Sequence, residues 1–266
     1  MNSAERQLAA VLDHRHAALV PRGNAAIFFS LFIAKKMGKK RVLIPDQGGW
    51  LTFKTYPSML GMKLDVLKTD DGLIDPQSIP LFSDAVLLFT QPAGYFAAQD
   101  MAGIYQHCKG KVLVIADVSG SIGSDLCHGD HADILVGSFG MWKPIDIGYG
   151  GFISVKEKEI MDHGKEILTI SKVHQTLERD IEARLKACPR RYHELFAKTE
   201  RTKMDLAGYD IIHRGKKGMN VVVAYETEKD KKEIVAYCVK EKLGYTLCPR
   251  YIRVMRSAIS IEVKRQ

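Results

Sequence analysis

The chain alternates short runs of branched apolar residues with longer helix-forming segments, and this alternation constrains its fold more than any other feature. The strand-like runs lie at residues 41–45, 63–68, 84–90, 111–117, 132–138 and 151–155. Strands that alternate with helices predict an α/β fold with a mostly parallel central sheet and flanking helices. The run at 84–90 is apolar almost throughout, so we expect that strand to be buried on both faces.

The helical patterns divide the chain into two unequal parts. In the first part, helices are expected at residues 3–20, 24–37, 51–60 and 98–108. After residue 155 come charged helical segments at 156–170 and 172–206, with breaks near Gly164 and Pro189, then strand-like runs at 219–225, 251–254 and 258–263 and a helix at 230–243. We therefore predict a large domain at 1–155, followed at 156–266 by a connecting helix and a small C-terminal α/β domain.

Charge divides the chain at nearly the same place. Residues 1–150 carry 14 basic and 14 acidic side chains, whereas residues 151–266 carry 25 and 17, so the net charge of +8 belongs to the second part. A basic face can bind tRNA or another polyanion. Acidic residues are mixed into this one, so a solvated surface is favoured and nucleic-acid binding stays an alternative. The 46% hydrophobic and 26% charged residues exclude a disordered chain.

The cysteines and the apolar runs indicate the compartment. The five cysteines form no CxxC pair, which is typical of reduced thiols rather than of a disulfide framework, and we expect no metal site. The longest apolar run, 25–34, is too short to span a bilayer. Charged residues near the N-terminus do not fit a signal peptide. We expect a cytoplasmic protein that has no membrane segment.

Polar and aromatic residues stand at the ends of the predicted elements, where open α/β sheets bind ligands. Gly23, Asn24 and Ala25 begin a helix, whose free N–H groups and dipole favour an anion. Asp117 ends an apolar strand, where a carboxylate needs a cation or a donor. Lys143 lies in a loop rich in glycine, aromatic and apolar residues, and a desolvated lysine of this kind can act as a nucleophile.

Each feature also has a simpler structural interpretation: Asn24 as a helix cap, Asp117 as a loop cap and Trp50 as a core residue. Their order along the chain indicates one shared pocket instead. A helix end, an aromatic ring, a strand-end carboxylate, then Ser138 and Lys143 would suit a ligand with an anionic group, a cationic ring and an aldehyde. Pyridoxal phosphate has this chemistry.

The sequence resembles the fold type I pyridoxal-phosphate enzymes, most closely their DegT/DnrJ-like sugar-aminotransferase branch. The resemblance covers residues 20–155 best and is carried by GNAAIFFSLFIAKKMGKKRVLIP, FTQPAGYFAAQDMAGIYQHCKGKVLVIADVSGSIG and GSFGMWKPIDIGYGGFIS. It implies that Asp117 binds the pyridinium nitrogen, that Lys143 forms the Schiff base and that Ser138 contacts the phosphate. The chain is short for this family, and Gly120 and Trp142 depart from its usual pattern.

The end of the chain, YIRVMRSAISIEVK, resembles the terminal strand on which many enzymes of this fold carry an arginine for a substrate carboxylate. Arg253 is the first candidate and Arg256 the second, and strand alternation would point them to opposite faces. The resemblance implies a homodimeric aminotransferase that acts on a small amino donor and a keto or keto-sugar acceptor. The alternatives are a lyase, a cysteine desulfurase using Cys127, an enzyme that modifies aminoacyl-tRNA, or a non-catalytic relative.

Overall fold

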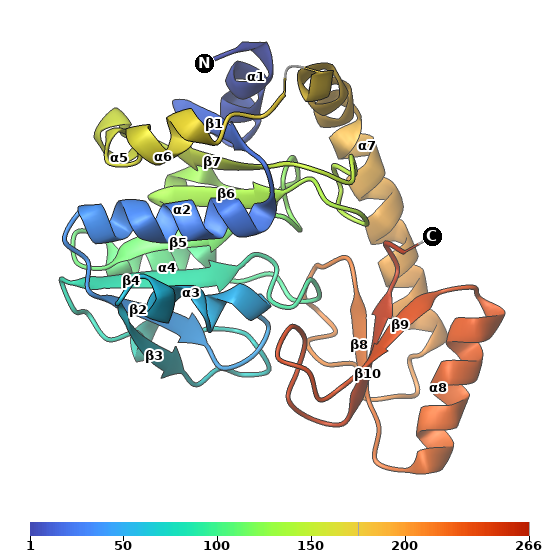
Figure 1. Ribbon diagram of the computed structural model, residues 1–266. Helices are drawn as coiled ribbons and strands as arrows, with labels where there is room; N and C mark the ends of the chain where they lie inside the picture. Colours follow the sequence, from blue (N-terminus) through green and yellow to red (C-terminus); the bar gives the residue numbers. More distant parts are fainter. Residues whose placement is uncertain (175, 266) are drawn as a thin grey trace.

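A seven-stranded sheet forms the larger part of the computed structural model, which describes residues 1–174 and 176–265 (Figure 1). The strand order is β1-β7-β6-β5-β4-β2-β3. The strands are β1 (His16–Val20), β2 (Arg41–Pro45), β3 (Lys63–Leu67), β4 (Ala85–Thr90), β5 (Leu113–Asp117), β6 (Ile134–Ser138) and β7 (Gly151–Val155). Neighbours from β3 to β6 run parallel, and β7 is antiparallel to β6 and to β1. The mostly parallel α/β sheet expected from the sequence is confirmed.

Helices cover both faces of this sheet and enclose a hydrophobic core on each. One core includes side chains of α2 (Gly23–Lys36) and packs against residues of α3 (Tyr56–Met59), α5 (Lys158–Asp162) and α6 (Lys165–Ile170). The other includes side chains of α1 (Ser3–Val11), α4 (Met101–Cys108) and α7 (Thr176–Asp205). Every residue of β4 is buried, as its apolar sequence predicted. Short 3-10 helices occur at η1 (Leu51–Phe53), η2 (Pro76–Ser78) and η3 (Gly129–His131).

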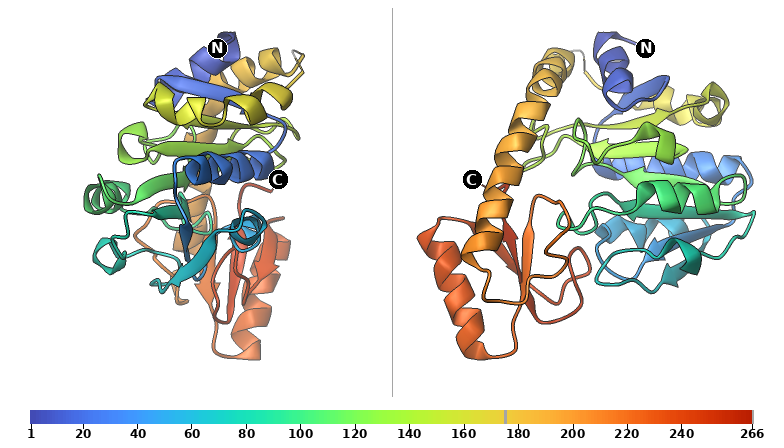
Figure 2. Two further views of the ribbon diagram at one scale, coloured as in Figure 1. Left: turned by 60° about the vertical axis from the view of Figure 1, so that its left-hand side comes forward. Right: turned by 180° about the vertical axis from the view of Figure 1, so that it is seen from behind.

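A smaller antiparallel sheet follows in the chain. Its order is β8 (Val221–Ala224), β10 (Ala258–Glu262), β9 (Gly244–Leu247), and α8 (Glu228–Lys240) packs on it. The 30-residue helix α7 extends from the large sheet to this small one, as the right view in Figure 2 shows. The domain boundary at residue 155 remains a prediction. The two helices that follow it, α5 and α6, pack on the large sheet rather than on the small one.

The first predicted helix, 3–20, is wrong beyond Val11. Leu12 caps the C-terminus of α1. The next residue, Asp13, has a φ of 54°, in the left-handed region that is common just after a helix. His16–Val20 then becomes β1 and pairs along its whole length with β7. The predicted helix 51–60 is likewise replaced by two short pieces, η1 and α3. In the first case the hydrogen bonds offered by a sheet edge outweigh helix propensity.

Two further predictions in the second part are corrected. Pro189 lies inside α7 rather than breaking it, because the neighbouring Leu185, Cys188 and Tyr192 pack into the core and hold the helix together. Residues 251–254 form a turn instead of a strand, closed by the N–H of Arg250 donating to the carbonyl of Val254 at 2.8 Å. This turn presents residues toward the carboxyl edge of the large sheet.

A core substitution tests the central position of β4. Leu87 is fully buried between helix-covered faces, so L87A should remove packing and leave a cavity, at a cost of about 2–5 kcal/mol in the free energy of unfolding. Urea denaturation measures this loss. The control L81A, at an exposed leucine, should change it by less than about 0.5 kcal/mol. Equal effects of the two variants would contradict the placement of β4.

Candidate functional site

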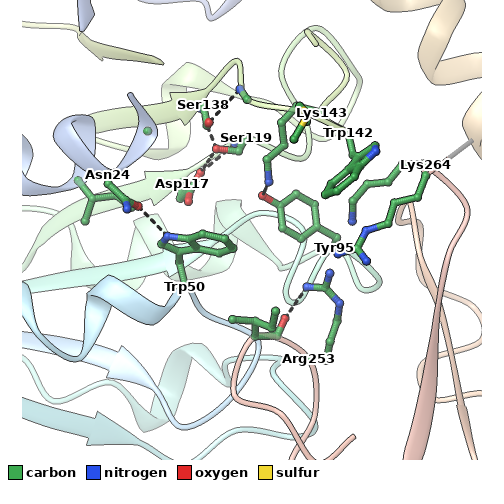
Figure 3. Close-up of a pocket in the computed structure, with 16 residues that line it drawn as sticks. Asn24, Trp50, Tyr95, Asp117, Ser119, Ser138, Trp142, Lys143, Arg253 and Lys264 are labelled. Atoms are coloured by element: carbon green, nitrogen blue, oxygen red, sulfur yellow. Dashed lines mark hydrogen bonds between the residues drawn. The ribbon is translucent and has the colours of Figure 1, made fainter. Parts of the chain in front are cut away.

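A pocket of about 320 Å³ lies at the carboxyl ends of the parallel strands (Figure 3). Its other side is formed by residues of the small domain, the part of the chain that contains the three-stranded sheet and α8. Its walls come from segments that are far apart in the sequence. The lining residues are Gly23, Asn24, Ile27, Trp50, Tyr95, Asp117, Ser119, Ser138, Gly140, Met141, Trp142, Lys143, Ile252, Arg253, Lys264 and Arg265. The structure thus brings together Gly23, Asn24, Trp50, Asp117, Ser138, Lys143 and Arg253 from the predicted site residues. Ala25 and Arg256 are not among the lining residues.

Asp117, the last residue of β5, is buried in the wall of this pocket. The Oδ1 atom of Asp117 accepts two hydrogen bonds from Ser119, one from the backbone N–H at 2.9 Å and one from the side-chain Oγ at 2.6 Å. The Ser119 Oγ in turn accepts from the backbone N–H of Ser138 at 2.9 Å, which links the ends of β5 and β6. Burial raises the pKa of the Asp117 carboxyl, and the Ser119 donors and the charge of Lys143 partly offset this rise. Such a carboxylate is poised to accept a hydrogen bond from a cationic ligand.

Lys143 extends from the loop after β6 into the pocket, and its Nζ donates a hydrogen bond to the Tyr95 hydroxyl (Figure 3). The same Nζ lies 4.2 Å from the centre of the Tyr95 ring and 5.5 Å from that of Trp50. Burial lowers the pKa of the Lys143 amine to about 8, although Asp117 opposes the shift. Roughly a tenth of this amine is therefore unprotonated at pH 7, a much larger share than in a lysine with the ordinary pKa of 10.5, and the neutral amine is the nucleophilic form.

Tyr95 lies at the centre of the site, and sequence reasoning missed it. Its ring has Lys143 at 4.2 Å, Lys264 at 4.3 Å and Arg253 at 5.5 Å from the centroid. Its backbone has a φ of 68°, an unusual value for a bulky residue. Gly120 packs directly on the ring, since a Cβ there would approach Tyr95 Cδ1 to 2.5 Å. The small residue noted as a departure from the family pattern therefore makes room for Tyr95.

The N-terminus of α2 forms the end of the pocket that lies opposite Lys264 (Figure 3). Its N-cap residue, Arg22, makes no side-chain capping hydrogen bond, so the first N–H groups of the helix remain available for an anion. Gly23 permits a close approach to Ser138, because a Cβ on Gly23 would lie 2.5 Å from the Cβ of Ser138. Asn24 is not a helix cap. Its Oδ1 accepts a hydrogen bond from Trp50 Nε1 at 2.8 Å, which holds the indole against the pocket.

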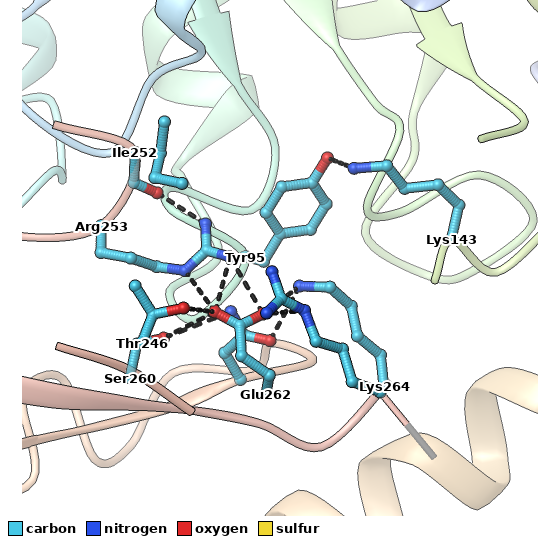
Figure 4. Close-up of polar contacts among 10 residues, drawn as sticks. Tyr95, Lys143, Thr246, Ile252, Arg253, Ser260, Glu262 and Lys264 are labelled. Atoms are coloured by element: carbon cyan, nitrogen blue, oxygen red, sulfur yellow. Dashed lines mark hydrogen bonds and ion pairs between the residues drawn. The ribbon is translucent and has the colours of Figure 1, made fainter. Parts of the chain in front are cut away.

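The small domain contributes a buried cluster of charges centred on Glu262 (Figure 4). Arg253 donates to this carboxylate from Nε at 2.9 Å and from Nη2 at 2.7 and 3.0 Å. Lys264 donates to it at 2.9 Å and to Asn220 Oδ1 at 3.0 Å. Burial alone would raise the pKa of Glu262, but Lys264 and Arg253 hold it below its ordinary value. Burial and Arg253 together lower the pKa of the Lys264 amine well below the usual range.

This cluster changes the role available to the predicted arginines. Arg253 lines the pocket, but its charge is compensated by Glu262, and its Nη1 donates to the carbonyl of Ile252 at 2.7 Å. Arg256 instead forms ion pairs with Asp71 at 3.4 Å and Asp210 at 2.9 Å. The argument from strand alternation does not apply to them, because residues 251–256 are not a strand.

Sequence reasoning missed other lining residues besides Tyr95, namely Ile27, Ser119, Gly140, Met141, Trp142, Ile252, Lys264 and Arg265. Ser119 could have been found, because a serine two residues after a strand-end aspartate often hydrogen-bonds it. Lys264 and Arg265 stand in a basic tail that reads as solvated surface, so no local signal marks them.

Three further observations concern a cysteine nucleophile, a metal site and a membrane segment. Cys127 is buried and is not among the pocket residues, and burial raises the pKa of its thiol to about 12, which disfavours it as a nucleophile. Across the part of the chain that the structure describes, no cluster of three or more His, Cys, Asp or Glu side chains could hold a metal ion. Among the described helices, none has the length and apolar character needed to cross a membrane.

Removing the charge of Glu262 tests the buried cluster. E262Q leaves the cations of Arg253 and Lys264 buried without a counter-charge, so the free energy of unfolding should fall by about 3–5 kcal/mol in urea denaturation. E226Q, at an exposed glutamate of the same domain, is the control and should have little effect. Because its folded pKa is depressed, the contribution of Glu262 is complete above its ordinary pKa and lost as pH falls through the folded value. A loss in E262Q no larger than in E226Q would argue against the cluster.

Comparisons with known proteins agree with this architecture. The Helicobacter pylori aminotransferase PseC, involved in pseudoaminic acid biosynthesis, has a TM-score of 0.76 at 15% identity, covering 97% of this chain and 84% of that one. The putative sugar aminotransferase Spr1654 from Streptococcus pneumoniae has a TM-score of 0.74 at 12% identity, covering 98% and 84%. The 3-amino-5-hydroxybenzoic acid synthase has a TM-score of 0.71 at 16% identity, covering 99% and 85%.

Sequence comparisons are more limited. The family described as "MJ1341 family C-terminal domain" matches residues 189–266. No curated protein matches the sequence. The structural similarity, which extends over nearly the whole chain, shows that this protein has the fold of the fold type I pyridoxal-phosphate-dependent transferases.

Proposed function

We propose that this protein is a pyridoxal-phosphate-dependent aminotransferase in which Lys143 binds the cofactor covalently. The observation that carries the proposal is the convergence of the Lys143 amine, the Asp117 carboxylate and the N-terminus of α2 on one pocket. Solved structures of the same fold support the cofactor. Spr1654 was solved in its PMP form, NtdA from Bacillus subtilis with bound PMP and a serine palmitoyltransferase with PLP.

The residues present fit this cofactor at each of its polar groups. The free N–H groups of α2 and the Ser138 hydroxyl suit the phosphate, and Gly23 lets Ser138 lie close to the start of the helix. Asp117 suits the pyridinium nitrogen, and Trp50 offers an indole face beside the ring site. A volume of about 320 Å³ is at the lower end of the range for small-molecule sites.

Pyridoxal phosphate, when bound, withdraws electrons from the substrate carbon that bears the amino group. The rest of the chemistry belongs to this chain. Asp117 would hold the proton on the ring nitrogen, which keeps the ring electron-poor. The Lys143 amine, once released by the incoming substrate, would carry a proton to and from the substrate carbon. Tyr95 orients the Lys143 Nζ by accepting its hydrogen bond.

The same similarity supports a proposal for the substrates. We propose a small amino donor and a keto or keto-sugar acceptor, since PseC and Spr1654 are described as an aminotransferase and a putative sugar aminotransferase.

We also propose a cytoplasmic homodimer. Exposed Met141, Trp142 and Tyr149 on the lysine loop support an association beside the pocket. Light scattering on the purified protein would measure the oligomeric state.

Covalent attachment at Lys143 is the first prediction of this proposal. Protein incubated with pyridoxal phosphate should acquire a visible absorption band, and borohydride reduction should fix the cofactor on Lys143, as seen by peptide mass mapping. K143A should take up no covalent label and lose transamination activity by about 10²-fold or more. The control K111A, at an exposed lysine, should behave as the wild type. Label on Lys264, or a protein that takes up no cofactor, would refute the assignment.

The lowered pKa of Lys143 predicts the pH dependence of this attachment. Only the neutral amine attacks the aldehyde, so the attachment rate should rise with pH and reach half its maximum near pH 8 rather than near 10.5. Because Asp117 raises the pKa of Lys143, D117N should move this midpoint to lower pH. Stopped-flow absorbance measures both profiles. A midpoint that moves upward in D117N would contradict the electrostatic coupling.

A further inference from the structure

A second groove adjoins the pocket on the small domain. It has a volume of about 380 Å³ and is lined by Tyr245, Thr246, Leu247, Arg250, Ile252 and Arg265. Ile252 and Arg265 also line the first pocket, so the two hollows meet at these side chains. We call the second hollow the Arg250–Arg265 groove. A ligand that extends from Lys143 past Ile252 would enter it.

The Arg250–Arg265 groove is positively charged and has no acidic residue among those that line it. Arg250 is exposed. The Arg265 guanidinium lies 4.8 Å from the centre of the Trp142 ring, which orients it between the two hollows. Its Nε is buried without a hydrogen-bond acceptor among the described residues. The closest recorded ion-pair contact of this Nε, Glu262 Oε2, lies 3.7 Å away.

Glu262 leaves Arg265 available because its oxygens are already engaged. Arg253 and Lys264 donate to them at 2.7–3.0 Å, much closer than Arg265 comes. The buried pair compensates the charge of Arg253. Recognition of an anion in the cleft thus falls to Arg265 and Arg250, whose guanidinium groups match carboxylates and phosphates with two parallel hydrogen bonds.

The remaining wall of the groove is apolar. Tyr245 and Leu247 alternate outward along β9 and are 38% and 45% exposed. An aromatic ring and an aliphatic side chain beside two arginines suit an organic group that ends in an acid, rather than a free inorganic ion alone.

We propose that the Arg250–Arg265 groove binds an acidic group, a carboxylate or a phosphate, at the far end of a substrate whose amino or keto group reaches Lys143. The identity of the bound molecule as a substrate depends on the proposed function, whereas binding of the anion does not. The structure thereby assigns the recognition of the substrate's charge to Arg265 and Arg250 and a supporting role to Arg253.

Trp142 provides a direct readout, because the chain has two tryptophans and W50F leaves Trp142 as the only one. The W50F protein, loaded with pyridoxal phosphate so that the N-terminus of α2 is filled, is titrated with inorganic phosphate and separately with glutarate. An anion at Arg265 should change Trp142 fluorescence in a saturable way. The affinity should fall about tenfold or more in R265Q and in R250Q. R256Q, at an arginine outside both hollows, is the matched control and should keep the affinity of W50F.

The outcomes separate the sources of the anion and the two proposals. Stronger binding of phosphate indicates a phosphate-bearing substrate, and stronger binding of glutarate indicates a carboxylate. In the same W50F background, R265K keeps the charge but not the forked geometry, so it should bind more weakly than W50F alone and more tightly than R265Q. No saturable change, or equal affinity in R265Q and R256Q, overturns the groove. If the protein takes up no pyridoxal phosphate but the protein as purified still binds an anion through Arg265, only the proposed function fails.

Discussion

The buried carboxylate of Glu262 fixes the side chains that the small domain presents to the pocket, and much of the site depends on it. Burying a charge costs several kcal/mol unless every lone pair is engaged, and here Arg253, Lys264 and Thr246 engage it. These contacts fix two cations of the small domain against the Tyr95 ring, which belongs to the loop after β4. The contacts of Arg253 and Lys264 with the Tyr95 ring therefore join parts of the chain that the sequence separates by more than 150 residues.

Tyr95 contacts both these side chains and Lys143. The ring is in contact with cations on its faces, and its hydroxyl accepts the hydrogen bond of the Lys143 amine. Burial and Arg253 lower the pKa of Lys143, while Asp117 and Glu262 raise it. The resulting value of about 8 is thus set mainly by burial. The arginine and the glutamate of the small domain act on the amine with opposite signs, so their effects partly offset each other.

The sequence predicted the parts of this structure that depend on local pattern. The apolar run at 84–90, the strand-end Asp117 and the loop that carries Lys143 were all visible, because a sheet edge imposes residue types over a few positions. The edge strand β1 was missed, since its pairing with β7 involves residues about 135 positions away. Tyr95 was missed for a similar reason: its role depends on Gly120 and Lys264, which no local window includes.

Residues 151–266 carry the excess positive charge of the chain, and the structure places part of this charge in the pocket. Two arginines of this part, Arg253 and Arg265, line the pocket, and Glu262 opposes them from the same domain. The single Glu262 carboxylate is already paired with Arg253, so Arg265 leaves net positive charge at the cleft. A cleft walled by low-dielectric side chains concentrates such a field and favours anionic ligands. The charge that read as solvated surface in the sequence is therefore partly internal, and it faces the position where a substrate would meet Lys143.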